Sequence, residues 1–232
     1  ITTSRSNELA TKIDFAAYGG YNFGNPTIPV MNAGDYRTLL SDLFKSNGIS
    51  GDSIASLPYM VDRKSFPDYY NYHNETDWQN ELVNKSFNNN YYLKVTGGDN
   101  IAKYALSLGY LTNKGALTNS DLTRYQMRFN GDLNLSKRLT AAVNLALVST
   151  QQDLLAQGGQ NDLSPLSLSL LKSPFLSVHI RDAEGATSPN LSGYDTMKVS
   201  NPVAIVNNMQ GKNKSYRFTG AVNFKYALRK DL

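Results

Sequence analysis

Side chains alternate between apolar and polar types without a break from Arg124 to Leu135. Successive side chains of a β-strand point to opposite sides, so this stretch predicts a strand with one apolar and one polar face. It is about twelve residues long, at or just beyond the upper end of what soluble domains usually show. The same length and contrast recur several times in the chain. That combination is typical of the wall of a transmembrane β-barrel.

Six segments carry the pattern and are predicted to be strands: 12–21, 90–96, 103–111, 124–135, 139–149 and 216–228. In the third segment, Tyr104 and Tyr110 share the apolar face and stand roughly 20 Å apart along the strand. With strand tilt, this is close to the separation of the two aromatic girdles that bracket the apolar band of an outer-membrane barrel.

The connections between these segments alternate strictly between short and long. The short ones are 97–100 and 136–138, and the long ones are 22–89, 112–123 and 150–215. Outer-membrane barrels show this alternation because one rim carries short turns and the other carries long loops. The predicted fold class is therefore all-β: part of a transmembrane antiparallel up-and-down β-barrel, with long extracellular loops that contain short helices.

Two helices are predicted in the first long connection. Apolar residues recur at helical spacing over 33–45, which begins after Asn32 or at Gly34-Asp35, and again over 77–85, with Thr76 or Asn74 as its N-cap. The connection 150–215 contains apolar residues over 163–171 and several Pro and Gly breaks. Its secondary structure is not assigned from the sequence.

Composition excludes several function classes for this chain of 232 residues. It has no cysteine, so a disulfide framework and a thiolate metal site are both excluded. Its two histidines, His73 and His179, are far apart, and no nucleophile with a nearby base stands out. The net charge is +4, and the lysines and arginines are scattered along the chain rather than clustered, which disfavours nucleic-acid binding. No apolar run of about eighteen residues predicts a transmembrane helix. No enzyme activity, cofactor or metal is expected.

An ordered set of motifs resembles one known family. The segments are Asp77-Trp78-Gln79, Tyr92 to Gly98, Lys103 to Leu111, Asn113-Lys114-Gly115, Asn119 to Tyr125 and Asn201-Pro202-Val203-Ala204. They resemble the early barrel of SusC/RagA-like TonB-dependent transporters, in the same order and over nearly the whole chain. The start, Ile1-Thr2-Thr3, resembles the end of that family's plug domain.

The resemblance implies a domain division and a function. Residues 1–11 are expected to be the end of the plug domain and its link into the barrel, and residues 12–232 the N-terminal portion of the barrel. The implied function is TonB-dependent import of an oligosaccharide or peptide across a Bacteroidetes-type outer membrane. The implied partners are a SusD-like surface lipoprotein, the TonB complex (through parts of the protein outside this chain), and outer-membrane lipid.

The alternation also assigns side chains to faces. The residues expected to face lipid are Tyr104, Leu106, Leu108, Tyr110, Phe218, Val222 and Phe224. Those expected to face the lumen are Arg124, Arg128, Asp132, Arg217 and Lys225. The candidates for contact with a ligand or the lipoprotein partner are Tyr69, Tyr70 and Tyr72, because tyrosine is favoured at interfaces.

Two other interpretations remain open at this point. A soluble, secreted β-rich glycan-binding module would show similar alternation, but it would bury the apolar face against a second sheet. A passive porin would have the same wall without a plug, and the resemblance of Ile1-Thr2-Thr3 to a plug end argues against it.

Overall fold

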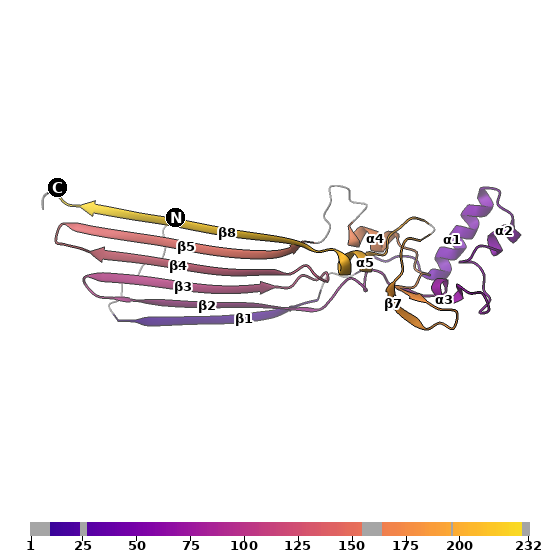
Figure 1. Cartoon of the computed structure of the whole chain (residues 1–232), viewed down its shortest axis with the longest axis horizontal. Helices are drawn as coiled ribbons and strands as arrows, with labels where there is room; N and C mark the ends of the chain where they lie inside the picture. The colour runs from indigo at the N-terminus through magenta and orange to yellow at the C-terminus, as the bar shows by residue number, and fades with distance from the viewer. Residues whose placement is uncertain (1–9, 24–26, 155–163, 196, 229–232) are drawn as a thin grey trace.

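Six long strands form one antiparallel sheet in the computed structural model, which describes residues 10–23, 27–154, 164–195 and 197–228. The strands are β1 Lys12–Asn22, β2 Ser86–Gly98, β3 Ala102–Asn113, β4 Leu122–Asn134, β5 Leu139–Leu154 and β8 Gly211–Tyr226. Their order across the sheet is β1-β2-β3-β4-β5-β8, so successive long strands are neighbours (Figure 1). Within the described residues the sheet is open, because β1 and β8 each pair with one strand. Most of the predicted plug end lies outside the described residues.

All the long connections leave the sheet at the same end. The β2–β3 and β4–β5 hairpin turns lie at the opposite end, on the left of Figure 1. In the β2–β3 turn the backbone N–H of Asp99 donates to the carbonyl of Ala102 at 2.8 Å, and Gly98 adopts a φ of 143°. The expected antiparallel sheet with helix-bearing connections is therefore confirmed.

Several strands extend farther toward the long connections than the alternation predicts. Strand β2 begins at Ser86 rather than at residue 90, β5 continues to Leu154, and β8 starts at Gly211. Polar residues occupy both faces of these extensions, so the apolar–polar contrast that marks the rest of the strands is absent there. Backbone pairing continues nevertheless, for example between Leu154 and Gly211.

The long connections contain short helices and a small hairpin. The first connection contains α1 Ala33–Ser46, α2 Gly51–Ala55 and α3 Tyr69–Tyr72, and the last contains α4 Pro165–Leu171, β6 His179–Arg181, β7 Thr187–Leu191 and α5 Pro202–Asn208. The helix predicted after Asn32 is confirmed, with the Asn32 side chain accepting from the Asp35 N–H as an N-cap. No helix within the described residues is long and apolar enough to cross a membrane.

The helix predicted over 77–85 is wrong, because this segment runs through successive turns. Two turns close within it, where the N–H groups of Glu81 and Leu82 donate to the carbonyls of Asp77 and Gln79. Its end instead bonds to the β3–β4 connection: the Leu82 carbonyl accepts from the N–H of Thr118 at 3.1 Å, and the Asn84 N–H donates to the Ala116 carbonyl at 2.8 Å. The Gln79 side chain holds the backbone of Ile28, accepting from its N–H at 2.8 Å and donating to its carbonyl at 2.7 Å. The apolar spacing reflects packing against other connections rather than a helix face: Trp78 lies in a core with Phe175, and Leu82 packs against Val206 and Leu117.

The first and last long connections share one hydrophobic core. We call their described residues, 27–85, 164–195 and 197–210, the loop unit. Its buried core combines Ala33, Leu40, Tyr59, Trp78, Phe175 and Leu176. The rings of Tyr59 and Phe175 stack at 5.4 Å, and the Trp78 indole donates to the Ser173 carbonyl at 3.0 Å. Segments about 100 residues apart in the chain therefore fold together at one end of the sheet.

Candidate functional site

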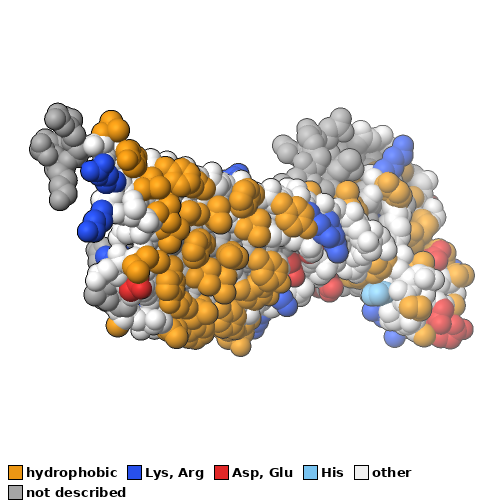
Figure 2. All heavy atoms as spheres, turned by 60° about the vertical axis from the view of Figure 1, so that its left-hand side comes forward, with side chains coloured by type: hydrophobic (Ala, Val, Ile, Leu, Met, Phe, Trp, Pro, Cys, Tyr) orange, Lys and Arg blue, Asp and Glu red, His pale blue; other side chains and the backbone are white. Residues whose placement is uncertain are grey.

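One face of the six-stranded sheet is apolar across its whole width. The register aligns one apolar residue from each strand: Phe15, Leu93, Leu108, Met127, Leu147 and Phe218. Figure 2 shows apolar side chains gathered in a continuous band over the strands. Phe15 is 67% exposed and Phe218 70% exposed, so nothing in the described part of the chain covers this face. Exposed apolar areas of this extent mark a surface that meets lipid or another protein.

Aromatic side chains border the apolar face. At the margin nearer the loop unit, one row across the sheet contains Tyr91, Tyr110, Tyr125 and Tyr216. The ring centroids of Tyr91 and Tyr110 are 6.1 Å apart, and those of Tyr110 and Tyr125 are 5.0 Å apart. At the other margin the aromatic residues are Tyr104, Phe224 and Tyr226. Two aromatic margins around an apolar band are typical of outer-membrane strands.

The residues predicted to face lipid all lie on this face. They are Tyr104, Leu106, Leu108, Tyr110, Phe218, Val222 and Phe224. Leu106 and Tyr110 are half-buried by neighbouring side chains, and the other five are exposed. The shared face follows from the register, whereas contact with lipid stays a prediction.

The residues predicted to face the lumen lie on the opposite, polar face. They are Arg124, Arg128, Asp132, Arg217 and Lys225. Among the described residues no ion pair joins the three arginines to a carboxylate, whereas Lys12 and Asp14 on the same face pair at 3.5 Å. On the same face and strand as Arg128, the Gln126 side chain lies over Gly109, where a Cβ would clash with the Gln126 amide nitrogen. The role of the five predicted residues at a lumen stays a prediction.

The three candidate tyrosines of α3 point in different directions. The Tyr69 ring stacks on His73 at 3.9 Å, and Tyr70 meets Tyr69 edge-on at 5.3 Å. Tyr72 instead packs against Tyr59, with centroids 6.3 Å apart, and so belongs to the core of the loop unit. The structure therefore does not bring the three rings to one surface, and their contact with a ligand or partner remains a prediction.

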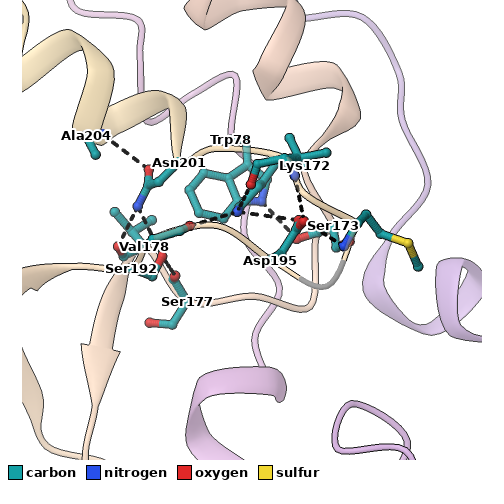
Figure 3. Close-up of polar contacts among 12 residues, drawn as sticks. Trp78, Lys172, Ser173, Ser177, Val178, Ser192, Asp195, Asn201 and Ala204 are labelled. Atoms are coloured by element: carbon teal, nitrogen blue, oxygen red, sulfur yellow. Dashed lines mark hydrogen bonds and ion pairs between the residues drawn. The ribbon is translucent and has the colours of Figure 1, made fainter. Parts of the chain in front are cut away.

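A buried polar network in the loop unit has no signal in the sequence. Lys172 Nζ lies 3.4 Å from Asp195 Oδ2 and donates to the carbonyls of Val199 at 2.6 Å and Gly193 at 3.2 Å (Figure 3). Burial lowers the pKa of the Lys172 ammonium, and the Asp195 carboxylate opposes that shift. Lys172 and Asp195 are 23 positions apart, in a segment without periodicity. Nothing in the sequence therefore indicates that they pair.

Asn201 connects the same segment to α5. Its side-chain amide donates to the Val178 carbonyl at 2.9 Å, and its side-chain oxygen accepts from the N–H of Val203 at 3.0 Å. Asn201 therefore serves as the N-cap of α5. The Asn-Pro-Val-Ala motif thus has a structural role that local capping chemistry explains.

No metal or catalytic constellation is found in the described residues. No group of three or more His, Cys, Asp or Glu side chains in the described ranges is placed to hold a metal ion. His73 Nε2 lies 3.8 Å from the carboxylate of Asp62. We assign no nucleophile to this pair. The geometry of the described residues is that of a two-faced wall joined to a folded loop unit.

Known proteins resemble this chain in part of its sequence and in its fold. No protein-family profile matches the chain. TonB-dependent receptor P3 of Formosa agariphila is 27% identical over 164 residues, which cover 65% of this chain and 16% of that receptor. The structure of the RagAB peptide transporter superposes with a TM-score of 0.68 at 14% identity over 94% of this chain and 26% of that chain. The open-open RagAB peptide importer superposes with a TM-score of 0.71 at 16% identity, covering 99% of this chain and 27% of that one.

The chain is similar in sequence to part of a TonB-dependent receptor, and it shares its fold with part of the solved RagAB structures. It spans 16% of the length of the receptor from Formosa agariphila. The first of the two solved structures is described as that of a peptide transporter and the second as that of a peptide importer. The likeness to RagAB, at 14–16% identity, establishes the fold of this chain. The six-stranded sheet and the loop unit are together the features that it shares with the solved structures.

Proposed function

We propose that this receptor segment forms part of the wall of a TonB-dependent importer in the bacterial outer membrane. The observation that carries the proposal is the uncovered apolar face of the sheet, bordered by Tyr110 at one margin and Tyr104 at the other. A strand wall in lipid needs such a face, since apolar side chains gain by leaving water. A two-sheet glycan-binding module would bury it instead.

The position of the loop unit supports an outward-facing role for the long connections. All helices of the described residues lie at one end of the sheet, while the hairpins at the other end are short (Figure 1). Outer-membrane barrels place long loops outside the cell and short turns in the periplasm. The loop unit is therefore proposed to lie at the cell surface, where a SusD-like lipoprotein partner would reach it.

The nutrient is proposed to be an oligosaccharide or peptide. The solved RagAB relatives are described as a peptide transporter and importer. The polar face, with Arg124, Arg128 and Arg217, would then line the path of the nutrient or contact the plug. Energy would come from the TonB complex through parts of the receptor that this chain does not include.

The absence of cysteine from this chain permits a direct test of the wall. Spin labels at Leu108→Cys and Ser107→Cys, in a full-length receptor without other reactive cysteines, sample adjacent positions on opposite faces of β3. In outer-membrane vesicles we expect the label at 108 to be accessible to oxygen and the label at 107 to a polar relaxation agent. Equal accessibility to the polar agent at both positions would contradict the membrane wall.

The import activity needs its own experiment. Deletion of the receptor gene is expected to abolish growth on the transported oligosaccharide or peptide, and purification of the receptor is expected to recover a lipoprotein in equal amount. Recovery of the receptor in the soluble fraction would instead favour a secreted glycan-binding module.

A further inference from the structure

Three arginines form a cluster on the polar face of the sheet, in the part nearer the loop unit. Arg124 and Arg128 lie on the same side of β4 and stand roughly 13 Å apart along the strand. Arg217 lies on β8, and its register partner Val148 pairs with Gln126 of β4, so it occupies the row between them. At the ordinary spacing of strands it stands roughly 12 Å from each. We call these three exposed residues the arginine cluster.

No ion pair joins the arginine cluster to a carboxylate within the residues that the structure describes. The described acids on the polar face of the strands lie away from the cluster. Asp14 is on β1, three strands from Arg128 across the sheet, and forms an ion pair with Lys12 at 3.5 Å. Asp132 lies four residues from Arg128 toward the β4–β5 turn, in register with Lys103. Guanidinium groups gathered in this way attract an anion to this part of the face.

A recess opens beside Arg128 on the same face, with a volume of about 170 Å³. Small-molecule sites usually span roughly 300–1,000 Å³, so this recess suits one group of a larger ligand rather than a whole ligand. Ala146 lines it with a single methyl group, which leaves the space open. The polar side chains that line it are those of Tyr92, Ser107, Gln126 and Arg128.

The recess offers hydrogen-bond donors. The Tyr92 hydroxyl lies 3.1 Å from the Ser107 hydroxyl and donates to it, which leaves the Ser107 hydrogen for a ligand. The Gln126 amide carries two N–H groups, and the Arg128 guanidinium presents its N–H groups in a planar fork. That fork matches the two oxygens of a carboxylate and binds them through two parallel hydrogen bonds. A carboxylate therefore satisfies both the charge and the donor geometry of the recess.

The small volume of the recess favours the carboxylate of an amino-acid side chain. In the aspartate and glutamate residues of a peptide, one or two methylene groups carry the carboxylate, so it can enter the recess alone. In a uronic acid the carboxylate is attached directly to the sugar ring, so the ring would have to follow it. A lysine side chain would be repelled by Arg128. The recess therefore fits an acidic peptide best.

We propose that the polar face binds peptides with acidic side chains, one of which places its carboxylate in the recess against Arg128. A second acidic side chain four positions along an extended peptide lies on the same side of it, roughly 13 Å away, and so reaches Arg217. The inference rests on the proposed function, because the polar face meets a nutrient only if it lines the lumen of an importer. It names the class of peptide that this lumen selects.

Binding is tested by calorimetry on the full-length receptor purified in detergent. The acidic probe is acetyl-Ala-Glu-Ala-Ala-Ala-Glu-Ala-amide, and the neutral probe has Gln in place of both Glu residues. Both peptides are capped, so their side chains alone decide their charge. A third probe, trigalacturonic acid, carries its carboxylates on sugar rings. We expect the acidic peptide to bind about tenfold more tightly than either of the other two probes.

Single substitutions assign the preference to the arginine cluster. Arg128→Gln and Arg217→Gln, both changes of exposed side chains, are each expected to weaken binding of the acidic peptide by roughly tenfold and to leave the neutral peptide unaffected. Arg128→Lys keeps the charge without the fork and is expected to lose less than Arg128→Gln. Lys225→Gln is the matched control, because Lys225 lies on the polar face of β8 roughly 26 Å along the strand from Arg217. It is expected to leave binding of both peptides unchanged.

Several results would overturn the inference. They are equal binding of the acidic and neutral peptides, no effect of Arg128→Gln, and equal weakening by Arg128→Gln and Lys225→Gln. Binding of trigalacturonic acid without binding of the acidic peptide would also overturn it, because the recess would then accept a sugar acid. The measurement requires no transport. Absence of the acidic preference while the label at 108 lies in lipid would count against this inference alone, whereas a label at 108 exposed to water would count against the proposed function.

Discussion

The Nζ atom of Lys172 lies 3.4 Å from Oδ2 of Asp195, and 1% and 2% of the two side chains are exposed. The pair joins the end of α4 to the segment after β7, and Lys172 also lies 5.9 Å above the Trp78 ring from the first connection. Figure 3 shows these residues meeting at one point. Through Lys172, this ion pair therefore connects the last long connection to the first.

Removal of one charge from this pair is predicted to destabilise the loop unit strongly. Lys172→Met leaves the Asp195 carboxylate buried without its cation, which costs about 3–5 kcal/mol in comparable cases. The free energy of local opening is measured by amide hydrogen exchange at Asn74, whose N–H donates to the carbonyl of the core residue Phe175 at 3.1 Å. The double variant Lys172→Met/Asp195→Asn removes both charges and keeps an acceptor oxygen for the N–H groups of Met197 and Val199. It is expected to recover much of that loss, and a double variant less stable than Lys172→Met would contradict the explanation.

The β2–β3 turn is predicted to require glycine at position 98. Gly98 has a φ of 143°, and a Cβ there would clash with the carbonyl oxygen of Ala102. Gly98→Ala is therefore expected to lower the free energy of unfolding by about 2 kcal/mol or more, as measured by urea titration of the receptor in liposomes. Gly20→Ala, where no atom lies within 4 Å of the added Cβ, is the control and should have a much smaller effect.

The same turn is predicted to lose stability in acid through Asp99. The backbone N–H groups of Ala102 and Ile101 donate to its carboxylate at 2.7 and 2.8 Å, and these bonds hold the pKa of Asp99 below its ordinary value of 3.8. A carboxylate with a depressed folded-state pKa contributes stability above its unfolded pKa, and that contribution is lost as the pH falls through the folded value.

Asp99→Asn keeps an acceptor oxygen but does not titrate, so it is the comparison for this pH dependence. The difference in unfolding free energy between the wild type and this variant is expected to shrink as the pH falls from about 5 to about 2. A difference that stays constant over this range would show that the carboxylate makes no net contribution to folding.

The sheet could be predicted from the sequence because its information is local. Alternation from Arg124 to Leu135 fixes which side chains share a face. A shift of the strand register by one residue would move every apolar side chain of that strand to the other face. The short turns then set the order of neighbouring strands. The start of α1 at Asn32 could be predicted for the same reason, because an N-cap side chain bonds to the backbone of the first turn that follows it.

The loop unit could not be predicted because its contacts are distant in the chain. Trp78 meets Ser173, and Thr76 donates to the Leu176 carbonyl, in pairs separated by about a hundred positions. The helix predicted over 77–85 is wrong because its apolar residues, Trp78 and Leu82 among them, pack in cores shared with the last connection. No periodicity within a window of that size distinguishes the two cases.

The outward direction of the apolar face yields the last prediction. Leu106 pairs in register with Val95 and Phe129 near the middle of the apolar band. Leu106→Arg is expected to cost about 2–4 kcal/mol of folded-barrel stability if that site faces mid-bilayer lipid, because a charge is placed in hydrocarbon. Thr219 lies on the polar face of the sheet, one register row from Leu106. Thr219→Arg therefore places the same charge at nearly the same depth but on the opposite face. It should change the unfolding free energy far less. A change near zero at Leu106, or equal changes at the two positions, would reverse or remove the outward assignment of the face.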